Sequence, residues 1–203
     1  MNIDHSQHQE ERPMVYVASL SDYNGGTLHG VWIDAKQSAE AIQAEVDAML
    51  ENSPEAKRYG TPAEEWAIHD YEGFGPIRLG EWESFEVISS LAHLLDQYGD
   101  AFAAYVAMEG LSGLEEDLEG AFTETYQGHY DDVADYAFRV AEDLGTMSRY
   151  QRDHYSMFQQ PDDLTTEWPF NCIDWEHAGR ELVLGGDIWT AEAPFGVYVF
   201  NNH

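Results

Sequence analysis

A stretch without any basic residue occupies the middle of the chain, from Leu79 to Tyr136. Arg78 is the last basic residue before it and Arg139 is the first after it. The stretch holds fourteen carboxylates and supplies no cation to pair them: Glu81, Glu83, Glu86, Asp96, Asp100, Glu109, Glu115, Glu116, Asp117, Glu119, Glu124, Asp131, Asp132 and Asp135. Mutual repulsion of these groups opposes compaction, so it constrains any fold that the stretch adopts.

Apolar side chains run through the same stretch, which is therefore not a solvated acidic tail. They are Phe85, Val87, Ile88, Leu91, Leu94, Leu95, Phe102, Tyr105, Val106, Leu111, Leu114, Leu118 and Phe122. Folded structure here presents dense negative charge at fixed spacing, and a fixed anionic surface requires a cationic partner.

The acidity extends over the whole chain. Its 203 residues include 39 acidic and 9 basic side chains, a formal charge of −30. Apolar residues at 43% and aromatic residues at 13% are sufficient for a packed core. A charge of this size and sign argues against direct binding to nucleic acid or to an anionic membrane surface.

Cysteine content and hydropathy favour a cytoplasmic protein. A single cysteine, Cys172, excludes an intrachain disulfide and a cysteine-rich zinc site. The apolar runs are far shorter than a membrane span, and residues 1–13 lack the basic and apolar regions of a secretion signal. We expect residues 1–13 to form a poorly ordered leader.

Apolar periodicity predicts a small N-terminal α+β domain over residues 14–80. Its expected elements are a strand, a turn, an antiparallel strand, a helix and a third strand, over residues 14–20, 21–26, 28–34, 38–50 and 65–71. Pro54 is expected to follow the end of the helix as a stop signal.

Capping residues predict a helical domain over residues 81–125. Ser84 suits the N-cap of a first helix, Gly99 separates it from a second, and Gly110 ends the second. Ser112 is expected to cap a third helix with a narrow apolar stripe.

The rest of the chain, residues 126–203, is expected to form a C-terminal α+β domain. Its predicted helices and strands cover residues 131–144, 150–158, 172–184, 187–191 and 196–200. The predicted fold class is α+β, with three small domains in a row.

The sequence contains no pattern typical of catalysis. Cys172 and His177 are five residues apart, a spacing that does not bring them together on a helix, so we interpret Cys172 as a packed core cysteine. His69, Asp70 and Glu72 are close in sequence, but a strand turns successive side chains to opposite faces. Nucleophile elbows, phosphate-binding loops and metal motifs are absent from the sequence. We therefore expect no enzyme activity, no cofactor and no metal site.

Adaptation to high salt is an alternative explanation of the acidity. Halophilic proteins are acidic and poor in lysine, and this chain contains only Lys36 and Lys57. Against this interpretation stand the many large aromatic residues and the concentration of charge in one base-free stretch. A halophilic enzyme remains one alternative, and an acidic module that binds some other basic protein is the nearer one.

Charge density indicates the kind of partner. Duplex DNA carries one negative charge per ~1.7 Å of axis, so two copies of this chain match the charge on roughly 30 base pairs. Only the outward-facing carboxylates count, which reduces the footprint to between one and two dozen base pairs. Carboxylates on a folded surface offer arginine and lysine the same charge-assisted bonds as phosphates do.

Four segments of the sequence resemble the ArdA antirestriction proteins. They are VYVASLSDYNGGTLHGVWIDA (residues 15–35), EEWAIHDYEGFG (residues 64–75), LSGLEEDLEGAFTETY (residues 111–126) and CIDWEHAGRELVLGGDIW (residues 172–189). The resemblance implies an elongated, dimeric DNA mimic, carried by mobile elements, that blocks type I restriction–modification enzymes at their specificity and methylase subunits. It also implies dimerisation through the C-terminal domain, whereas the N-terminal leader departs from the family pattern.

Fifteen acids make up the predicted partner-binding surface. The resemblance places five of them in the acidic antirestriction motif: Glu115, Glu116, Asp117, Glu119 and Glu124. Charge and helix phase extend the surface to Asp131, Asp132 and Asp135. The resemblance widens it further, and the predicted surface also includes Glu64, Glu65, Asp70, Glu72, Glu109, Glu142 and Asp143.

Overall fold

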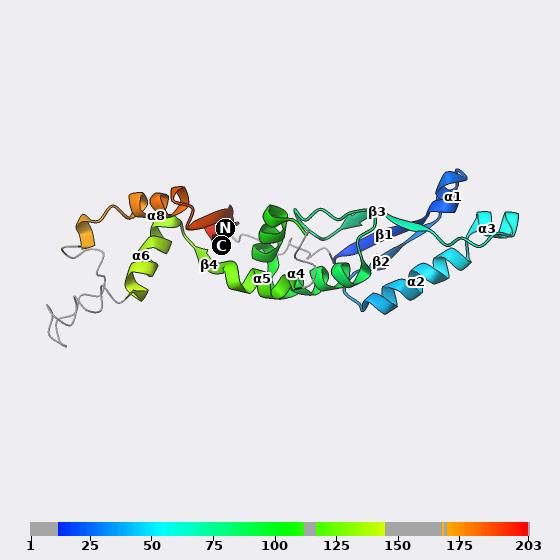
Figure 1. The fold of residues 1–203 in the computed structure, drawn as a ribbon, viewed down its shortest axis with the longest axis horizontal. Helices are drawn as coiled ribbons and strands as arrows, with labels where there is room; N and C mark the ends of the chain where they lie inside the picture. The colour runs from blue at the N-terminus through cyan, green and yellow to red at the C-terminus, as the bar shows by residue number, and fades with distance from the viewer. Residues whose placement is uncertain (1–11, 112–116, 145–167, 169, 203) are drawn as a thin grey trace, which may run out of the picture. The chain divides into compact units, whose positions relative to one another are not determined.

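The computed structural model describes residues 12–111, 117–144, 168 and 170–202. Helices and two three-stranded antiparallel sheets make up these residues, which confirms the α+β class (Figure 1). The chain forms two compact units, Met1–Ala121 and Phe122–His203. The division into three domains, with boundaries near residues 80 and 125, stays a prediction.

The first unit is built on a sheet with the strand order β2-β1-β3. β1 (Met14–Ser19) lies between β2 (Gly30–Asp34) and β3 (Trp66–Glu72) and is antiparallel to both. Alternation along β1 turns Val15 and Val17 into the core, where both are fully buried. The sequence therefore predicted the three strands of this sheet.

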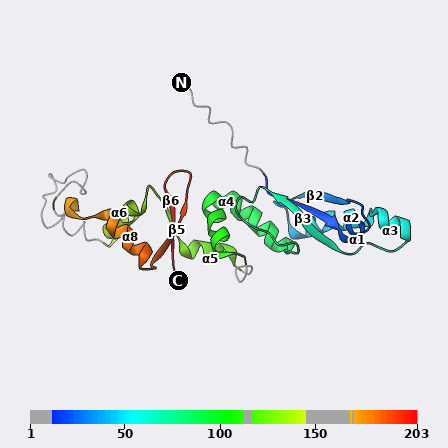
Figure 2. The same cartoon turned by 90° about the horizontal axis from the view of Figure 1, so that it is seen from above.

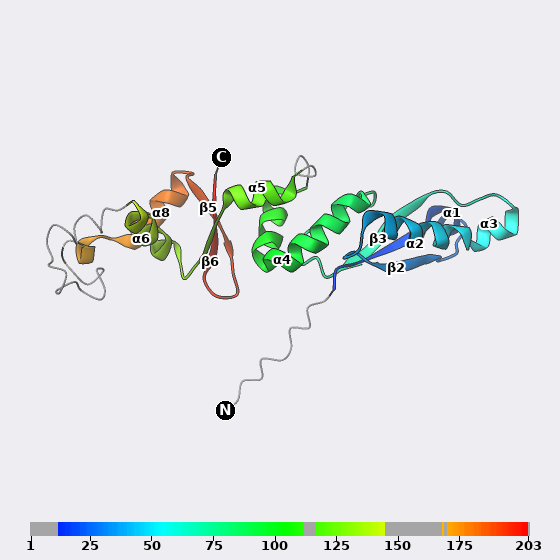
Figure 3. The ribbon, with the colours of Figure 1, turned by 90° about the horizontal axis from the view of Figure 1, so that it is seen from below.

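One face of this sheet is covered by α2 (Ala39–Glu51). Ser38 caps α2 by accepting a hydrogen bond from the Ala41 N–H at 3.3 Å. The helix buries Ile42, Val46, Met49 and Leu50. It lies below the strands in Figure 1 and in front of them when seen from below in Figure 3. Seen from above, the strands lie in front of α2 (Figure 2).

Two short helices stand where the sequence predicted a turn and a helix stop. α1 (Leu20–Asn24) occupies the predicted turn because the Ser19 hydroxyl caps it. α3 (Pro54–Tyr59) begins at the predicted stop because Ser53 caps it and proline fits the first helical position. Proline ends one helix and starts the next, a dual role that periodicity alone does not resolve.

Asp22 is a buried carboxylate that links these two helices. It lies on α1, is fully buried, and its Oδ1 accepts a hydrogen bond from the N–H of Glu55 on α3 at 2.9 Å. Burial alone would raise the pKa of Asp22, but the hydroxyls of Ser19 and Ser53 and the Glu55 N–H hold its pKa below the usual value. The ionised form is therefore the one that the fold stabilises.

The long helix α4 (Phe85–Glu109) contains the interruption predicted from its glycine. Ser84 caps its start and Gly110 ends it, as expected. Gly99 has φ 60° and ψ −143°, a conformation that side chains other than glycine rarely adopt, so the helix is kinked there. α4 joins the core of the first unit through Phe85, whose ring stacks on Trp66 of β3 with 4.5 Å between centroids.

α5 (Leu118–Thr125) begins later than the sequence predicted. Its first turn is capped by Asp117, whose Oδ1 accepts a hydrogen bond from the Gly120 N–H at 2.8 Å. A Cβ atom at Gly120 would lie 2.3 Å from the other Asp117 oxygen, so glycine lets the Asp117 carboxylate approach this turn closely. The predicted cap, Ser112, lies outside the described residues.

The second unit contains a sheet with the order β4-β6-β5. β5 (Ile188–Glu192) and β6 (Val197–Asn201) agree with the two predicted C-terminal strands. β4 (Tyr126–Tyr130) was not predicted, because YQGHY is short and lacks β-branched residues. It pairs with β6 in an antiparallel register that is irregular between Tyr126 and Gly128.

Two helices pack on each other beside this sheet. α6 (Val133–Asp143) is capped by Asp132, and α8 (Trp175–Leu184) follows the short helix η2 (Phe170–Cys172). A Cβ atom at Gly179 would lie 2.3 Å from the Val133 carbonyl oxygen, so glycine permits this close approach. The helix predicted over residues 150–158 lies outside the described residues.

We expect Asp22→Asn to destabilise the protein near neutral pH by about 1 kcal/mol, because a hydrogen bond to a charged acceptor is replaced by a weaker neutral one. The folded pKa of Asp22 lies below the unfolded one. Its ionisation therefore stabilises the fold above the unfolded pKa, and this contribution is lost as the pH falls through the folded pKa. Urea unfolding at a series of pH values measures the difference between variant and parent, which should shrink in acid. The exposed Asp47→Asn is the control, and a pH-independent difference for Asp22→Asn would contradict the assignment.

Two substitutions of Asp117 separate its hydrogen bond as the helix cap of α5 from its negative charge. Asp117→Ala should lower stability by about 1 kcal/mol through loss of the cap, whereas Asp117→Asn should cost only a few tenths because asparagine caps equally well. Thermal unfolding of both variants measures this. Equal stability of the two variants would show that the cap does not contribute to folding.

Candidate acidic binding surface

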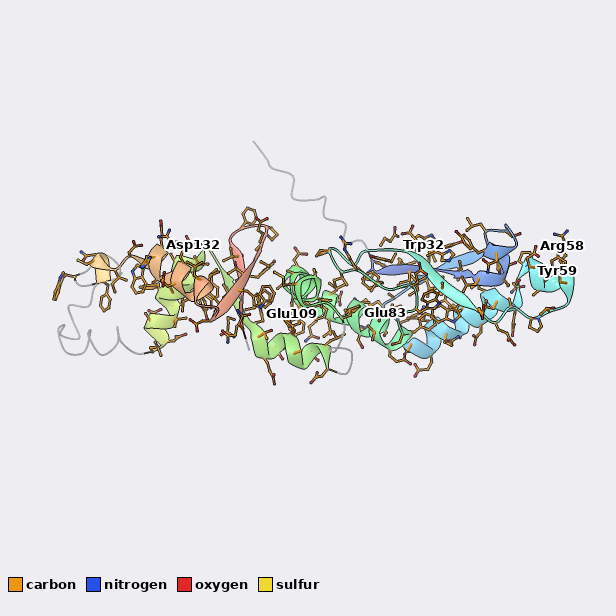
Figure 4. All side chains as sticks on the ribbon, turned by 45° about the horizontal axis from the view of Figure 1, so that its top comes forward. Trp32, Arg58, Tyr59, Glu83, Glu109 and Asp132 are labelled. Carbon is orange, nitrogen blue, oxygen red and sulfur yellow. The ribbon has the colours of Figure 1, made fainter. Side chains whose placement is uncertain are left out.

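The structure exposes most of the predicted carboxylates. Twelve of the fifteen are exposed: Glu64, Glu65, Asp70, Glu72, Glu109, Asp117, Glu119, Glu124, Asp131, Asp132, Glu142 and Asp143. Asp135 is half-buried, and Glu115 and Glu116 lie outside the described residues. The exposed groups belong to both units, and Figure 4 labels Glu109 on α4 and Asp132 before α6.

Two of these carboxylates also cap helices. Asp117 caps α5, and the Asp132 Oδ1 accepts hydrogen bonds from the N–H groups of Ala134 at 2.8 Å and Asp135 at 2.9 Å. Negative charge is favourable at these positions because the helix N-terminus carries a partial positive charge. The local fold therefore fixes the position of each of these carboxylates.

Glu119 is positioned by hydrogen bonds from a neighbouring helix. Its Oε1 accepts from the Tyr98 hydroxyl at 2.8 Å and from the Gln97 Nε2 at 3.1 Å. The hydrogen bond to Glu119 raises the pKa of Tyr98. These contacts connect α5 to α4 without neutralising the carboxylate.

Two acids of the base-free stretch have cation partners, contrary to the expectation that all fourteen would lack one. The Lys36 Nζ lies 2.5 Å from an oxygen of Asp96, and the Arg139 Nε lies 3.5 Å from an oxygen of Asp135. The sequence did not reveal the first pair because folding brings the segment before α2 against α4. Both pairs are exposed enough that each contributes no more than about 1 kcal/mol to stability.

Arg139 also forms an ion pair with a second acid of the predicted surface. Its Nη1 donates a hydrogen bond to the Glu142 Oε2 at 3.2 Å, and this hydrogen bond, together with the nearby Asp135 carboxylate, raises the pKa of the guanidinium. Within the described ranges, Asp135 and Glu142 are therefore two members of the predicted surface whose charge Arg139 compensates.

Other predicted acids have no such compensation. In the part of the chain that the structure describes, no lysine or arginine forms an ion pair with Glu64, Glu65, Glu72, Glu109, Glu124, Asp131 or Asp143. Their backbones belong to folded elements or to the turns that join them, so the fold sets where these solvent-exposed charges emerge.

The helix α2 has an acidic face that was not predicted from the sequence. Because the apolar positions of this helix face the sheet, Glu40, Glu45, Asp47 and Glu51 face solvent, and all four are exposed. Hydrogen bonds from its own N–H and from the Ser38 hydroxyl hold the pKa of Glu40 below its usual value. The absence of any base between Lys36 and Lys57, read with the helical period, was the signal that could have revealed this face.

Acids occupy both sides of the first unit. The cross-strand partner of Asp70 is Tyr16, which alternation turns away from the buried Val15 and Val17. Asp70 therefore lies on the face of the sheet opposite α2, whereas Glu40 and Asp47 lie on the outer side of α2. Cationic groups can bind this unit from either side.

Cys172 is not the core residue that the sequence predicted. It is exposed in η2, with its thiol donating to the Asn171 Oδ1 at 3.3 Å. The apolar side of this segment is provided instead by Phe170, which is buried against Phe138, Ala141 and Trp175.

The described residues contain no group of three or more His, Cys, Asp or Glu side chains that could bind a metal ion. Their helices also include none that is both long and apolar enough to cross a membrane. What the arrangement offers chemically is a set of fixed, solvated carboxylates for cationic groups of a partner.

Comparison with known families agrees with this chemistry. No curated protein matches the chain. Residues 15–196, which include all of the predicted acidic surface, match the family described as antirestriction protein (ArdA). The chain belongs to the ArdA family of antirestriction proteins.

Proposed function

We propose that the chain inhibits type I restriction–modification enzymes as a DNA mimic. Its carboxylates occupy the groove in which the specificity and methylase subunits bind duplex DNA, so that incoming DNA of a mobile element escapes cleavage. The observation that carries the proposal is the set of exposed carboxylates on folded elements, many of which form no ion pair with a lysine or arginine of the described residues.

Rigidity makes these carboxylates a substitute for phosphates. Asp117 and Asp132 are fixed as helix caps, and Glu119 is fixed by Tyr98 and Gln97. Groups that are already ordered lose little conformational freedom on binding. Lysine and arginine of a DNA groove can pair with them as they pair with phosphates, and displacement of counterions favours association.

Inhibition by occupancy requires no chemistry on the inhibitor. The basic groove of an enzyme attracts a chain with a formal charge of −30 over a distance set by the ionic strength. Association is therefore fast in low salt and slows as salt screens the charges. We place this competition in the cytoplasm, where restriction enzymes meet incoming DNA.

A homodimer doubles the length of the mimic. The sheet of the second unit turns Tyr198 and Phe200 of β6, with their cross-strand partner Trp189, to the face opposite the buried Val199. The Trp189 and Phe200 rings stack with 4.1 Å between centroids. Phe195, in the β5–β6 connection, is 85% exposed. Phe200 is itself fully buried, so the half-buried Trp189 and Tyr198, together with Phe195, are the aromatic side chains that support a dimer interface on the second unit.

The amide variant Glu109→Gln, Glu115→Gln, Glu116→Gln, Glu124→Gln tests the mimic surface. We expect it to inhibit a purified type I enzyme at least tenfold less well, because each exposed ion pair contributes up to about 1 kcal/mol. The salt dependence of inhibition should also become shallower, since fewer counterions are exchanged. DNA cleavage assays over a range of inhibitor and salt concentrations measure both quantities.

A matched control changes four exposed acids that lie outside the predicted surface: Glu176→Gln, Glu181→Gln, Asp187→Asn and Glu192→Gln. Both variants lose the same charge, so a loss of inhibition confined to the first variant supports a located surface. An equal loss in both would reduce the proposal to a general effect of net charge. Full inhibition by a folded first variant would refute this surface. Failure to protect foreign DNA in cells would favour the acidic module for another basic protein.

A further inference from the structure

The face of the first sheet opposite α2 carries a row of two aromatic rings and one acid. Tyr16 on the central strand has Trp32 as its cross-strand partner on β2 and Asp70 as its partner on β3. Directly paired residues in an antiparallel sheet project to the same face, a few ångströms apart. Across the strands β2, β1 and β3, the row therefore consists of Trp32, Tyr16 and Asp70.

Gly30 leaves the space that the Tyr16 ring occupies. A Cβ atom on Gly30 would lie 2.7 Å from the Tyr16 Cζ, so the ring extends across β2 over this glycine. There it lies beside Trp32, with 5.5 Å between ring centroids and 48° between planes. Trp32 is still 41% exposed, so its ring remains accessible from solvent. Figure 4 labels Trp32 on β2.

A second row flanks the rings with acids. Met14 pairs with Asp34 on one side and with Glu72 on the other. Two residues along a strand correspond to about 6.6–6.8 Å, so this row lies one side chain away from the aromatic row. We name these six residues the aromatic patch: Met14, Tyr16, Trp32, Asp34, Asp70 and Glu72.

The patch itself includes no basic residue. The neighbouring Lys36 is paired with Asp96 of α4. Among the described residues, the cations found over aromatic rings are Arg58 over Tyr59 and Arg139 over Phe138. The patch therefore combines apolar surface, π faces and three carboxylates without an internal counter-charge.

We infer that the aromatic patch is a binding site for arginine side chains of the cationic partner. This inference rests on the proposed function, and it specifies the chemistry of one contact between the protein and the enzyme that it inhibits. A guanidinium stacks on an aromatic face while its N–H groups bond to a carboxylate, and the patch supplies both kinds of group on one face of the sheet. Lysine, a strongly hydrated point charge, makes neither the planar stack nor the paired hydrogen bonds.

The charge of the patch favours an arginine side chain over two other possible occupants, a second copy of the chain and an uncharged apolar segment. A second copy of the chain, meeting the patch through the same surface, would bring Asp34, Asp70 and Glu72 against their own equivalents. An uncharged apolar segment would cover these carboxylates without pairing them, which is unfavourable. A guanidinium satisfies both the rings and the acids.

Peptides of six arginines and of six lysines test the site in the full-length protein. We expect the arginine peptide to bind more tightly than the lysine peptide of equal charge. We also expect it to shift the NMR signal of the Trp32 indole N–H, which is assigned by its loss in Trp32→Phe. Trp32→Ala should weaken arginine-peptide binding by roughly two- to thirty-fold, from the range of cation–π energies at exposed and desolvated sites. Its effect on lysine-peptide binding should be smaller.

Matched variants separate stacking from charge. Tyr59→Ala removes an exposed aromatic ring that Arg58 of the chain already covers, so it should leave the preference for arginine unchanged. Asp70→Asn should reduce the preference while keeping the aromatic pair. Trp32→Phe retains a ring and should fall between the parent and Trp32→Ala, so the series remains informative if the alanine variant does not fold.

Several outcomes would overturn the inference. They are equal binding of both peptides, equal effects of Trp32→Ala and Tyr59→Ala, or a change of oligomeric state in Trp32→Ala, which would assign the patch to a second copy. The proposed function is tested separately by enzyme inhibition. If the amide variant of the acidic surface loses inhibition and Trp32→Ala does not, the patch fails and the mimic stands. If neither variant loses inhibition, both fail.

Discussion

Repulsion between carboxylates is the constraint on which the rest of this structure depends. A formal charge of −30 on 203 residues opposes a compact state, and the described residues contain few ion pairs to offset it. Cohesion comes instead from apolar faces, such as the side of α2 that covers Val15 and Val17. Because many of the described carboxylates have no lysine or arginine partner, a basic protein that supplies cations relieves a repulsion that the free protein retains.

Some acids of the predicted surface stabilise the fold through hydrogen bonds as well as contributing negative charge. Asp117 and Asp132 complete the first turns of α5 and α6, and Glu119 joins α5 to α4. Others, such as Glu109 and Glu124, are exposed without an ion pair among the described residues. A charge that also caps a helix is costly to remove and is fixed in position, whereas an unsupported one affects only the surface potential. Substitutions at the two kinds of position therefore report on different properties of the protein.

Local chemistry explains which parts of the fold could be predicted from sequence. Ser84, Gly99 and Gly110 act through hydrogen bonds and dihedral angles within a few residues, and each has the role that the sequence predicted. Asp22 and the Lys36–Asp96 pair could not be foreseen, because their partners are brought together only by tertiary packing. β4 was missed because its strand character depends on pairing with β6 near the end of the chain. For the acidic surface, the sequence identified exposed positions, while the acids of α2 required knowing which side of that helix faces the sheet.

We propose that this protein and duplex DNA compete for one groove. Inhibition of a purified type I enzyme by the full-length chain, measured at increasing concentrations of a duplex that carries the recognition site, tests this competition. We predict that the protein concentration giving half inhibition rises in proportion to the duplex concentration, and that saturating duplex abolishes inhibition. Inhibition that is unaffected by duplex concentration would contradict it, because the chain would then act at a site other than the DNA groove.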